Sequence, residues 1–256
     1  MQKKVKHIFQ CAFSGKTPRG DTMSQEWFDH RTDLYLKYTL PSLKNQTNKN
    51  FLIWLSFRPQ DKENPNTKRI SKALEESGLL NIMTFCGTMF TEDRAVWHNV
   101  DLKERLANCL PLVKPFIEEE YVYETNLDSD DMVHKEFSAL VQSKEFKDHG
   151  ALYMKTGFAY HTADRLAEWN NPTSNQNYTI MFPRDIYLDA EKRLAYLNGF
   201  DSHEKIPEMF NAEQLPDHYY CTVIHGSNIS TVWNHQFRGQ EIYDEESKKE
   251  LLKNFK

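Results

Sequence analysis

The chain has 256 residues, of which 39% are hydrophobic and 13% aromatic, so it can bury a sizeable core. Its formal net charge of −5 argues against a general nucleic-acid-binding protein, which would show a basic excess or a basic stripe. No window approaches the roughly 20 apolar residues of a membrane span, and no sustained apolar segment follows the charged start, as it would in a signal peptide. We therefore expect a soluble, cytoplasmic protein.

The four cysteines, Cys11, Cys86, Cys109 and Cys221, are scattered along the chain. None belongs to a C-x-x-C pair, so neither a zinc ribbon nor a redox motif is expected. Several lie in apolar runs, which suits buried free thiols in a reducing compartment.

The chain begins with a strand-like segment and then a helix. Val5–Phe13 mixes β-branched, aromatic and small residues, which predicts a first strand. After a polar loop, Asp29 is expected to cap a helix that carries Leu34 and Tyr38. Pro41 is expected to bend or interrupt this helix.

Strands and helices then alternate up to about residue 150. Phe51–Leu55 is a continuous apolar run, typical of a strand buried on both faces. Alternation of this kind predicts an α/β fold with a mainly parallel central sheet covered by helices. The further elements expected are a helix at 68–76 ended by Gly78, a strand at 79–85, a helix at 102–113, a strand at 121–127 and a helix at 135–143.

The second half is less regular, with strands expected at Ala151–Met154, Tyr178–Phe182 and Tyr220–Ile224. The Asn-rich segment Asn170–Asn177 separates the first two of these strands and is expected to be a polar loop. We expect one domain over residues 1–256. In it, about 1–131 binds a nucleotide, about 132–240 forms the side for a second substrate, and 241–256 forms a C-terminal helix.

The tetrad Asp128-Ser129-Asp130-Asp131 follows directly on the strand predicted at 121–127. Three carboxylates within four positions repel one another and are costly to desolvate, so they stay in water or bind a cation. A hard divalent ion held by one or two carboxylates also holds substrate phosphates. The alternative is an acidic turn that caps the helix expected near Lys135. The carboxyl end of a strand in an α/β sheet favours the ion, because ligands bind there.

Three motifs follow one another along the chain: YLKYTLPSLKNQT at residues 35–47, NLDSDD at residues 126–131 and HGSN at residues 225–228. With these motifs the chain resembles glycosyltransferases of the GT-A fold and, more narrowly, a family of rhamnosyltransferases. The second motif matches the D-x-D motif of that family, followed by another aspartate. The three motifs cover most of the chain, from about residue 5 to residue 230.

The resemblance implies a nucleotide-diphosphate sugar donor, a glycan or glycolipid acceptor, inversion at the anomeric carbon, and a Mn²⁺ or Mg²⁺ ion that bridges the diphosphate. By analogy, Asp130 would coordinate the ion, and Asp128 would contact the ribose or the donor sugar. Asp131 would either ligate the ion or orient the site. His225 matches the position of a further metal ligand; the alternative is a hydrogen-bonded loop histidine.

Three more residues are candidates for binding the nucleotide sugar. Arg31 and Arg105 carry a guanidinium fork that suits phosphate, and Asp61 follows the strand expected at 51–55. For each arginine the alternative is an ordinary surface ion pair.

Inverting transfer also needs a base that deprotonates the acceptor hydroxyl. Asp201 is the first candidate, because NGFDSHE at residues 198–204 resembles the acceptor-side loops of this superfamily, and Glu204 is the second. Asp185 and Asp189 come after these two. The alternative for each is an exposed acid or a helix cap.

Two other functions remain open from the sequence. A metal-dependent phosphohydrolase or nuclease also needs clustered carboxylates, but it would bring a second acidic cluster. A non-catalytic nucleotide- or glycan-binding protein would keep the fold without turnover. The closing segment Asp244–Lys256 has acids first and lysines later, which suits a helix that packs on its own domain; peripheral contact with a membrane is the alternative.

Overall fold

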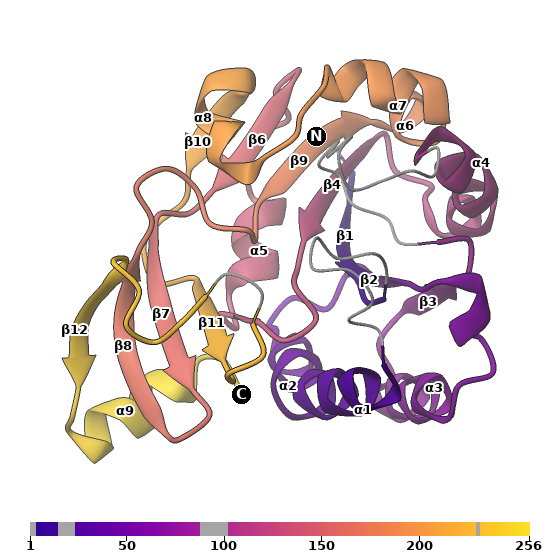
Figure 1. Ribbon diagram of the computed structural model, residues 1–256. Helices are drawn as coiled ribbons and strands as arrows, with labels where there is room; N and C mark the ends of the chain where they lie inside the picture. Colours follow the sequence, from indigo (N-terminus) through magenta and orange to yellow (C-terminus); the bar gives the residue numbers. More distant parts are fainter. Residues whose placement is uncertain (1–3, 15–23, 88–101, 229–230) are drawn as a thin grey trace.

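The computed structural model describes residues 4–14, 24–87, 102–228 and 231–256 (Figure 1). Within these ranges the chain forms a seven-stranded sheet with helices on both faces, and a five-stranded sheet beside it. The α/β class predicted from the alternating pattern is therefore confirmed. The second sheet was not predicted.

The seven-stranded sheet has the order β10-β6-β9-β4-β1-β2-β3. Strands β4, β1, β2 and β3 are parallel neighbours, and β10 is parallel to β6. Strand β9 is antiparallel to both β4 and β6. The sheet is thus mainly parallel, with one reversed strand. Its strands are β1 (Val5–Ala12), β2 (Phe51–Ser56), β3 (Asn81–Thr84), β4 (Tyr121–Asn126), β6 (Gly150–Tyr153), β9 (Thr179–Pro183) and β10 (Asn211–Gln214).

Both faces of this sheet are buried, and the side chains of β2 alternate between two cores. Phe51, Ile53 and Leu55 enter one core, and Leu52 and Trp54 enter the other. Because β2 is buried on both faces, its side chains are apolar at successive positions and do not alternate with polar ones. The first face is covered by α1 (Gln25–Leu34), a π-helical turn (Tyr35–Thr39), α2 (Leu40–Lys44), α3 (Pro65–Ser77) and α5 (Phe137–Gln142), and the second by α4 (Leu102–Val113), α6 (Arg184–Tyr187), α7 (Ala190–Leu197) and α8 (Ile206–Met209).

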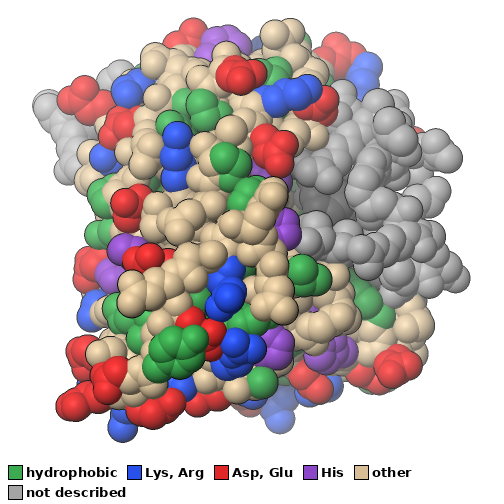
Figure 2. Space-filling view, turned by 60° about the vertical axis from the view of Figure 1, so that its left-hand side comes forward, with side chains coloured by type: hydrophobic (Ala, Val, Ile, Leu, Met, Phe, Trp, Pro, Cys, Tyr) green, Lys and Arg blue, Asp and Glu red, His purple; other side chains and the backbone are tan. Residues whose placement is uncertain are grey.

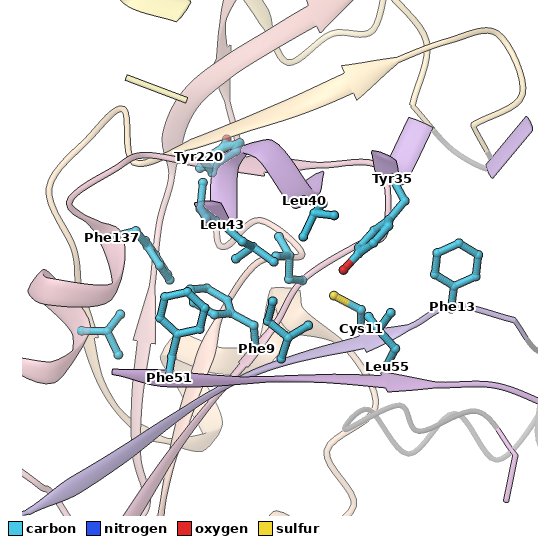
Figure 3. Packing of buried hydrophobic residues seen from close by; sticks show 14 of the residues in the cluster. Phe9, Cys11, Phe13, Tyr35, Leu40, Leu43, Phe51, Leu55, Phe137 and Tyr220 are labelled. Atoms are coloured by element: carbon cyan, nitrogen blue, oxygen red, sulfur yellow. The ribbon is translucent and has the colours of Figure 1, made fainter. Parts of the chain in front are cut away.

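Figure 3 shows the first core from close by. Phe9 and Cys11 of β1 lie on the same side of the sheet as Leu55 of β2 and face the layer formed by Tyr35 and Leu43. The hydroxyl end of Tyr35 points towards Cys11. Each large side chain buried here stabilises the fold by about 1.5–3 kcal/mol relative to leaving it exposed. This packing fixes α1 and α2 against the sheet.

The first helix begins earlier than predicted. The side chain of Ser24 accepts a hydrogen bond from the backbone N–H of Trp27, so Ser24 is the N-cap of α1. The prediction that Asp29 caps the helix is wrong, because Asp29 lies within it. Pro41 follows the π-helical turn inside a helical run that continues from Gln25 to Lys44, so the regular α-helix is interrupted before the proline without ending there. Helix α3 ends before Gly78, as predicted.

The five-stranded sheet has the order β12-β8-β7-β11-β5. Helix α9 (Glu245–Leu252) lies against it, and Leu251, Leu252 and Phe255 pack near Phe158 and Tyr160 of β7 (Figure 1). A helix is therefore present near the end of the chain, and it packs on the five-stranded sheet. The strands are β5 (Met132–Val133), β7 (Thr156–His161), β8 (Arg165–Asn170), β11 (Tyr220–Ile224) and β12 (Arg238–Ile242), and the short 3₁₀ turns are η2 (Pro59–Asp61), η3 (Lys114–Phe116) and η4 (His203–Lys205).

The four cysteines are free, and Cys86 alone among them is only partly buried. The face shown in Figure 2 carries acidic and basic side chains side by side. In the part of the chain that the structure describes, no helix combines the length and the apolar character that crossing a bilayer requires.

Candidate active site

The tetrad lies at the edge where the parallel strands of the first sheet end. Ala12 of β1 is beside Ser56 of β2, and Ser56 is beside Thr84 of β3. Gln10 of β1 is beside Asn126, the last residue of β4. Because these carboxyl ends meet at one edge, the loops that follow them come together. The position predicted for the tetrad is therefore confirmed.

Asp130 is a buried carboxylate of the tetrad, and side chains from two distant segments meet on it. Nε2 of His225, which follows β11, lies 2.8 Å from its Oδ2, and Nη1 of Arg31, from α1, forms an ion pair with the same oxygen. Burial alone would raise the pKa of Asp130, but Arg31 and His225 together hold that pKa below its ordinary value. Asp130 is therefore ionised, and its charge is balanced by residues remote in sequence.

The HGSN motif forms the turn that carries His225 out of β11. The backbone N–H of His225 donates to Oδ1 of Asn228 at 2.8 Å, and Gly226 takes a φ of 82°, which suits glycine. Nδ1 of His225 lies 2.9 Å from Oγ of Ser227 and 3.1 Å from Nε2 of His30. Both ring nitrogens of His225 are thus engaged, which fixes the orientation of the imidazole.

Asp131 is also buried, and both of its carboxylate oxygens are hydrogen-bonded. Oδ2 accepts from Nε2 of Gln176 at 2.7 Å, from Nδ2 of Asn177 at 3.0 Å and from Oγ1 of Thr222 at 3.3 Å. Oδ1 accepts from the backbone N–H of Val223 at 3.0 Å. Burial and the two neighbouring carboxylates raise the pKa of Asp131 well above its ordinary value. These contacts join the tetrad to β11. Of the two roles predicted for Asp131, ligating the ion or orienting the site, they favour the second.

Asp128 opens the tetrad and is only partly buried. Its backbone N–H donates to Oδ1 of Asn177 at 3.3 Å, and its carbonyl accepts from the N–H of Asp131 at 3.1 Å. His30, Gln176 and Asn177 are site residues that no motif indicated. The signal for the two amides was only that residues 170–177 are rich in side-chain amides, and a polar loop explained that composition equally well.

Asp61 lies beyond the carboxyl end of β2, at the same edge. Its carboxylate accepts two hydrogen bonds from the guanidinium of Arg58, both at 2.9 Å, and one from Oγ of Ser14 at 2.5 Å. Ser14 follows β1, so Asp61 ties the ends of β1 and β2 together. Asp61 therefore lies at the same edge of the sheet as the tetrad, with β1 between β2 and β4, and its binding of a nucleotide stays a prediction.

Arg105 is a buried residue of α4, and its side chain lies against Gly87, three residues beyond the end of β3. A β-carbon at Gly87 would lie 2.5 Å from Cδ of Arg105, so only glycine admits this close approach. The backbone N–H of Gly87 donates to the carbonyl of Phe57 at 3.0 Å, directly after β2. Arg105 is therefore held at the carboxyl edge of the sheet, near the end of β3. Asp61 lies after the neighbouring strand, β2.

Asp201 and Glu204, the predicted bases, lie between α7 and α8. Asp201 pairs with Lys205 at 2.8 Å, and the backbone N–H of Glu204 donates to Oγ of Ser202 at 3.3 Å. These are the contacts of a surface ion pair and a helix start, and they do not single out either carboxylate.

Phe200, the residue before Asp201, packs on Tyr178, which is hydrogen-bonded to the end of β4. The ring of Phe200 packs edge-on against Tyr178 at 5.5 Å, and the carbonyl of Tyr178 accepts from the N–H of Asn126 at 2.9 Å. The residue before Asp201 therefore packs on a neighbour of the last residue of β4, and Asp201 itself pairs with Lys205.

The donor set at the tetrad fits a divalent ion. Carboxylate oxygen suits both Mn²⁺ and Mg²⁺, and the imidazole nitrogen favours Mn²⁺ of the two, because Mg²⁺ takes oxygen ligands. The Ser227 hydroxyl both donates and accepts, so His225 keeps a partner at Nδ1 when Nε2 binds a metal. Among the described residues, no group of three or more His, Cys, Asp or Glu side chains is gathered closely enough to hold an ion. An ion on Asp130 and His225 would take its other ligands from phosphate and water.

No protein-family model matches the chain, and no curated protein matches it in sequence. Among solved structures, it is similar to residues 1–349 of TarS from S. aureus in complex with UDP, with 16% identity and a TM-score of 0.42 over 86% of this chain and 60% of that one. Mouse xyloside xylosyltransferase 1 has 11% identity and a TM-score of 0.39 over 83% and 85% of the two chains. The inositol-1-phosphate CTP transferase from T. maritima has 14% identity and a TM-score of 0.35 over 88% and 87%. These distant likenesses assign neither an activity nor a substrate.

Proposed function

We propose that the protein is a metal-dependent glycosyltransferase that moves a sugar from a nucleotide-diphosphate donor to a hydroxyl of a glycan or glycolipid, with inversion. The observation that carries the proposal is the convergence on Asp130, at the end of β4, of an imidazole and a guanidinium from distant segments. Carboxylate, imidazole and guanidinium are the groups that a diphosphate and its ion require. The resemblance of the three motifs to GT-A glycosyltransferases supports the same reading.

The proposed roles combine the positions of the side chains with what the resemblance implies. Asp130 and His225 hold the ion, Asp131 orients the tetrad against β11, and Asp128 contacts the ribose or the donor sugar. The bound ion would stabilise the negative charge that develops on the leaving diphosphate. Arg31 and Arg105, at the same edge, bind phosphate, and Asp61 lies on the nucleoside side.

The first experiment measures nucleotide binding. Calorimetric titration with UDP, GDP and dTDP, with and without Mn²⁺, is expected to show binding of at least one nucleotide that depends on the metal. Asp130→Ala should abolish this dependence. Asp33→Ala is the matched control, because Asp33 lies on the exposed side of α1 and its loss changes the charge equally. Binding that does not respond to Mn²⁺, or that survives in Asp130→Ala, would contradict the proposal.

The second experiment tests whether the protein transfers a sugar and which residue is the general base. A panel of nucleotide sugars, beginning with a rhamnose donor because of the family resemblance, identifies the donor that gives product. With that donor, Asp201→Asn or Glu204→Gln should lower kcat by about 10²-fold or more while nucleotide affinity stays unchanged, as expected for loss of a general base. If both variants keep wild-type kcat, neither residue is the base.

A further inference from the structure

Helix α1 contacts both residues that are proposed to hold the ion. Arg31 forms the ion pair with Asp130, and the preceding residue, His30, places Nε2 at 3.1 Å from Nδ1 of His225. Two successive residues of one helix therefore contact the proposed metal ligands: Arg31 at the carboxylate of Asp130, and His30 at Nδ1 of His225, the ring nitrogen that does not face Asp130. The oxygen of Asp130 that faces His225 is the same oxygen that Arg31 contacts.

The guanidinium of Arg31 has further capacity to bind an anion. Its Nε is buried and has no hydrogen-bond partner within the described part of the chain. The guanidinium lies 5.5 Å from the centre of the Trp27 ring, and the side chain keeps 18% of its surface exposed. A buried N–H without a partner is unfavourable, so a second anion beside Arg31 would gain more than at a satisfied arginine.

A divalent ion on Oδ2 of Asp130 competes with the Arg31 guanidinium, because Arg31 and His225 already use the two lone pairs of that oxygen and the two cations repel each other at close range. A metal ion that arrives alone must displace Arg31 without compensation. A diphosphate that arrives with the ion offers Arg31 new acceptors and supplies the ligands that Asp130 and His225 do not provide.

We propose that Arg31 is an internal cation that makes the binding of the metal ion and of the diphosphate mutually dependent. In the free site it neutralises Asp130 and keeps the affinity for metal alone low. When the diphosphate binds, Arg31 moves to the phosphate and leaves Asp130 to the ion. The inference rests on the proposed function and concerns the order of assembly of that same site. Because coupling between two ligands is reciprocal, each should raise the affinity for the other.

Arg31→Gln tests the inference, because it should change the two affinities in opposite directions. Titration with Mn²⁺ alone, followed by the electron paramagnetic resonance signal of free Mn²⁺, should show affinity raised about tenfold or more over wild type. Calorimetry with UDP and GDP at saturating Mn²⁺ should show nucleotide affinity lowered about tenfold, since a charge-assisted contact is lost. Arg31→Lys keeps the positive charge and should leave the affinity for Mn²⁺ alone near that of wild type.

Arg69→Gln is the matched control, because Arg69 forms a similar arginine–aspartate pair with Asp33 at 2.7 Å on the exposed side of α1. It should change neither affinity. If wild type shows metal-dependent nucleotide binding but Arg31→Gln binds Mn²⁺ no more tightly, the inference is wrong and the proposed function stands. If wild type binds no nucleotide in the presence of Mn²⁺, the proposed function fails and the inference fails with it.

Discussion

Strand β4 and the tetrad that follows it each contain a carboxylate paired with an arginine, and the two pairs differ in how completely they are enclosed. Within β4, Glu124 pairs with Arg193 of α7 at 2.5 Å, and the two side chains are 1% and 2% exposed. The hydroxyl of Tyr187 donates to the same carboxylate at 2.5 Å, and the guanidinium lies 4.3 Å from the centre of the Tyr187 ring. Beyond the strand end, Asp130 pairs with Arg31, whose side chain is 18% exposed.

The difference in exposure indicates that Glu124–Arg193 is a structural pair and that Asp130–Arg31 is able to exchange partners. A fully buried pair loses water on every side, so removing one partner leaves an uncompensated charge in the core. A pair at the sheet edge retains access to solvent and a second partner, His225, so its members are free to exchange contacts with a ligand. The expected effects of substitutions therefore differ in size and in kind between Glu124–Arg193 and Asp130–Arg31.

The largest effect is expected from opening the enclosed pair. Glu124→Ala leaves Arg193 buried without its carboxylate and should lower the free energy of unfolding by about 3–5 kcal/mol. Chemical denaturation measures this loss. Glu168→Ala, at a carboxylate that is 41% exposed, is the control and should change stability by less than about 0.5 kcal/mol. A loss in Glu124→Ala as small as in the control would show that the pair is not structural.

A smaller effect is expected where the tetrad joins β11. Asp131→Ala leaves the donors of Gln176, Asn177, Thr222 and Val223 without their shared acceptor, and should lower the free energy of unfolding by about 2–3 kcal/mol. Asp131→Asn should cost less, because one oxygen remains and the neighbouring amides are able to rotate. Denaturation of both variants checks the order, and equal losses would argue that packing rather than hydrogen bonding holds this junction.

The next effect concerns pH and a histidine that supports β4 from β1. His7 is buried, with Nε2 at 2.8 Å from Oγ1 of Thr125 and Nδ1 at 3.1 Å from Oγ of Ser138, and burial lowers its pKa from 6.5 to about 3. Between these values the unfolded chain binds a proton that the folded protein does not. This residue should therefore lower the free energy of unfolding by up to about 1.4 kcal/mol for each unit of acidification within that window.

Denaturation at several pH values tests the contribution of His7. His7→Gln should reduce the slope of stability against pH, whereas His218→Gln, at a side chain that is 44% exposed, should keep the wild-type slope. An unchanged slope in His7→Gln would mean that other groups cause the acid sensitivity.

The smallest effect on stability is expected from the open pair. Arg31→Gln should lower the free energy of unfolding by about 1 kcal/mol or less, because Asp130 keeps the His225 contact and Arg31 is partly solvated. Thermal or chemical denaturation measures it beside Glu124→Ala. A loss as large as that of Glu124→Ala would remove the distinction between the two pairs.

Local pattern was sufficient for much of the first sheet. The leucine spacing predicted α4 over residues 102–113, the apolar run predicted β2, and the Tyr220–Ile224 strand has the predicted bounds. These elements are readable because their faces are buried along their whole length, so that the periodicity of the sequence equals that of the structure. The start of α1 was missed because Asp29 and Ser24 are both good caps, and the position of the hydrophobic face chose between them.

The second sheet was harder to predict because its strands are paired through distant parts of the chain. The β7–β8 hairpin was not recognised, because charged residues interrupt the apolar residues on both of its faces, Glu168 on one and Arg165 on the other. Strand β12 joins it from residues 238–242. The pairing of β11 with both β7 and β5 brings His225 to the tetrad, across a separation of 95 residues. No local pattern contains that register.

The sequence by itself therefore determined where the carboxylates gather. An apolar strand in an alternating chain must end at the edge of a sheet, and Asp128, Asp130 and Asp131 come directly after it. Only the tertiary structure decided how they divide their contacts. Asp131 accepts hydrogen bonds inside the fold from β11 and from residues 176–177, whereas Asp130 contacts Arg31 and His225. The physical reason is that a carboxylate takes its role from the donors that long-range packing brings to it, and neighbouring positions in a turn face different surroundings.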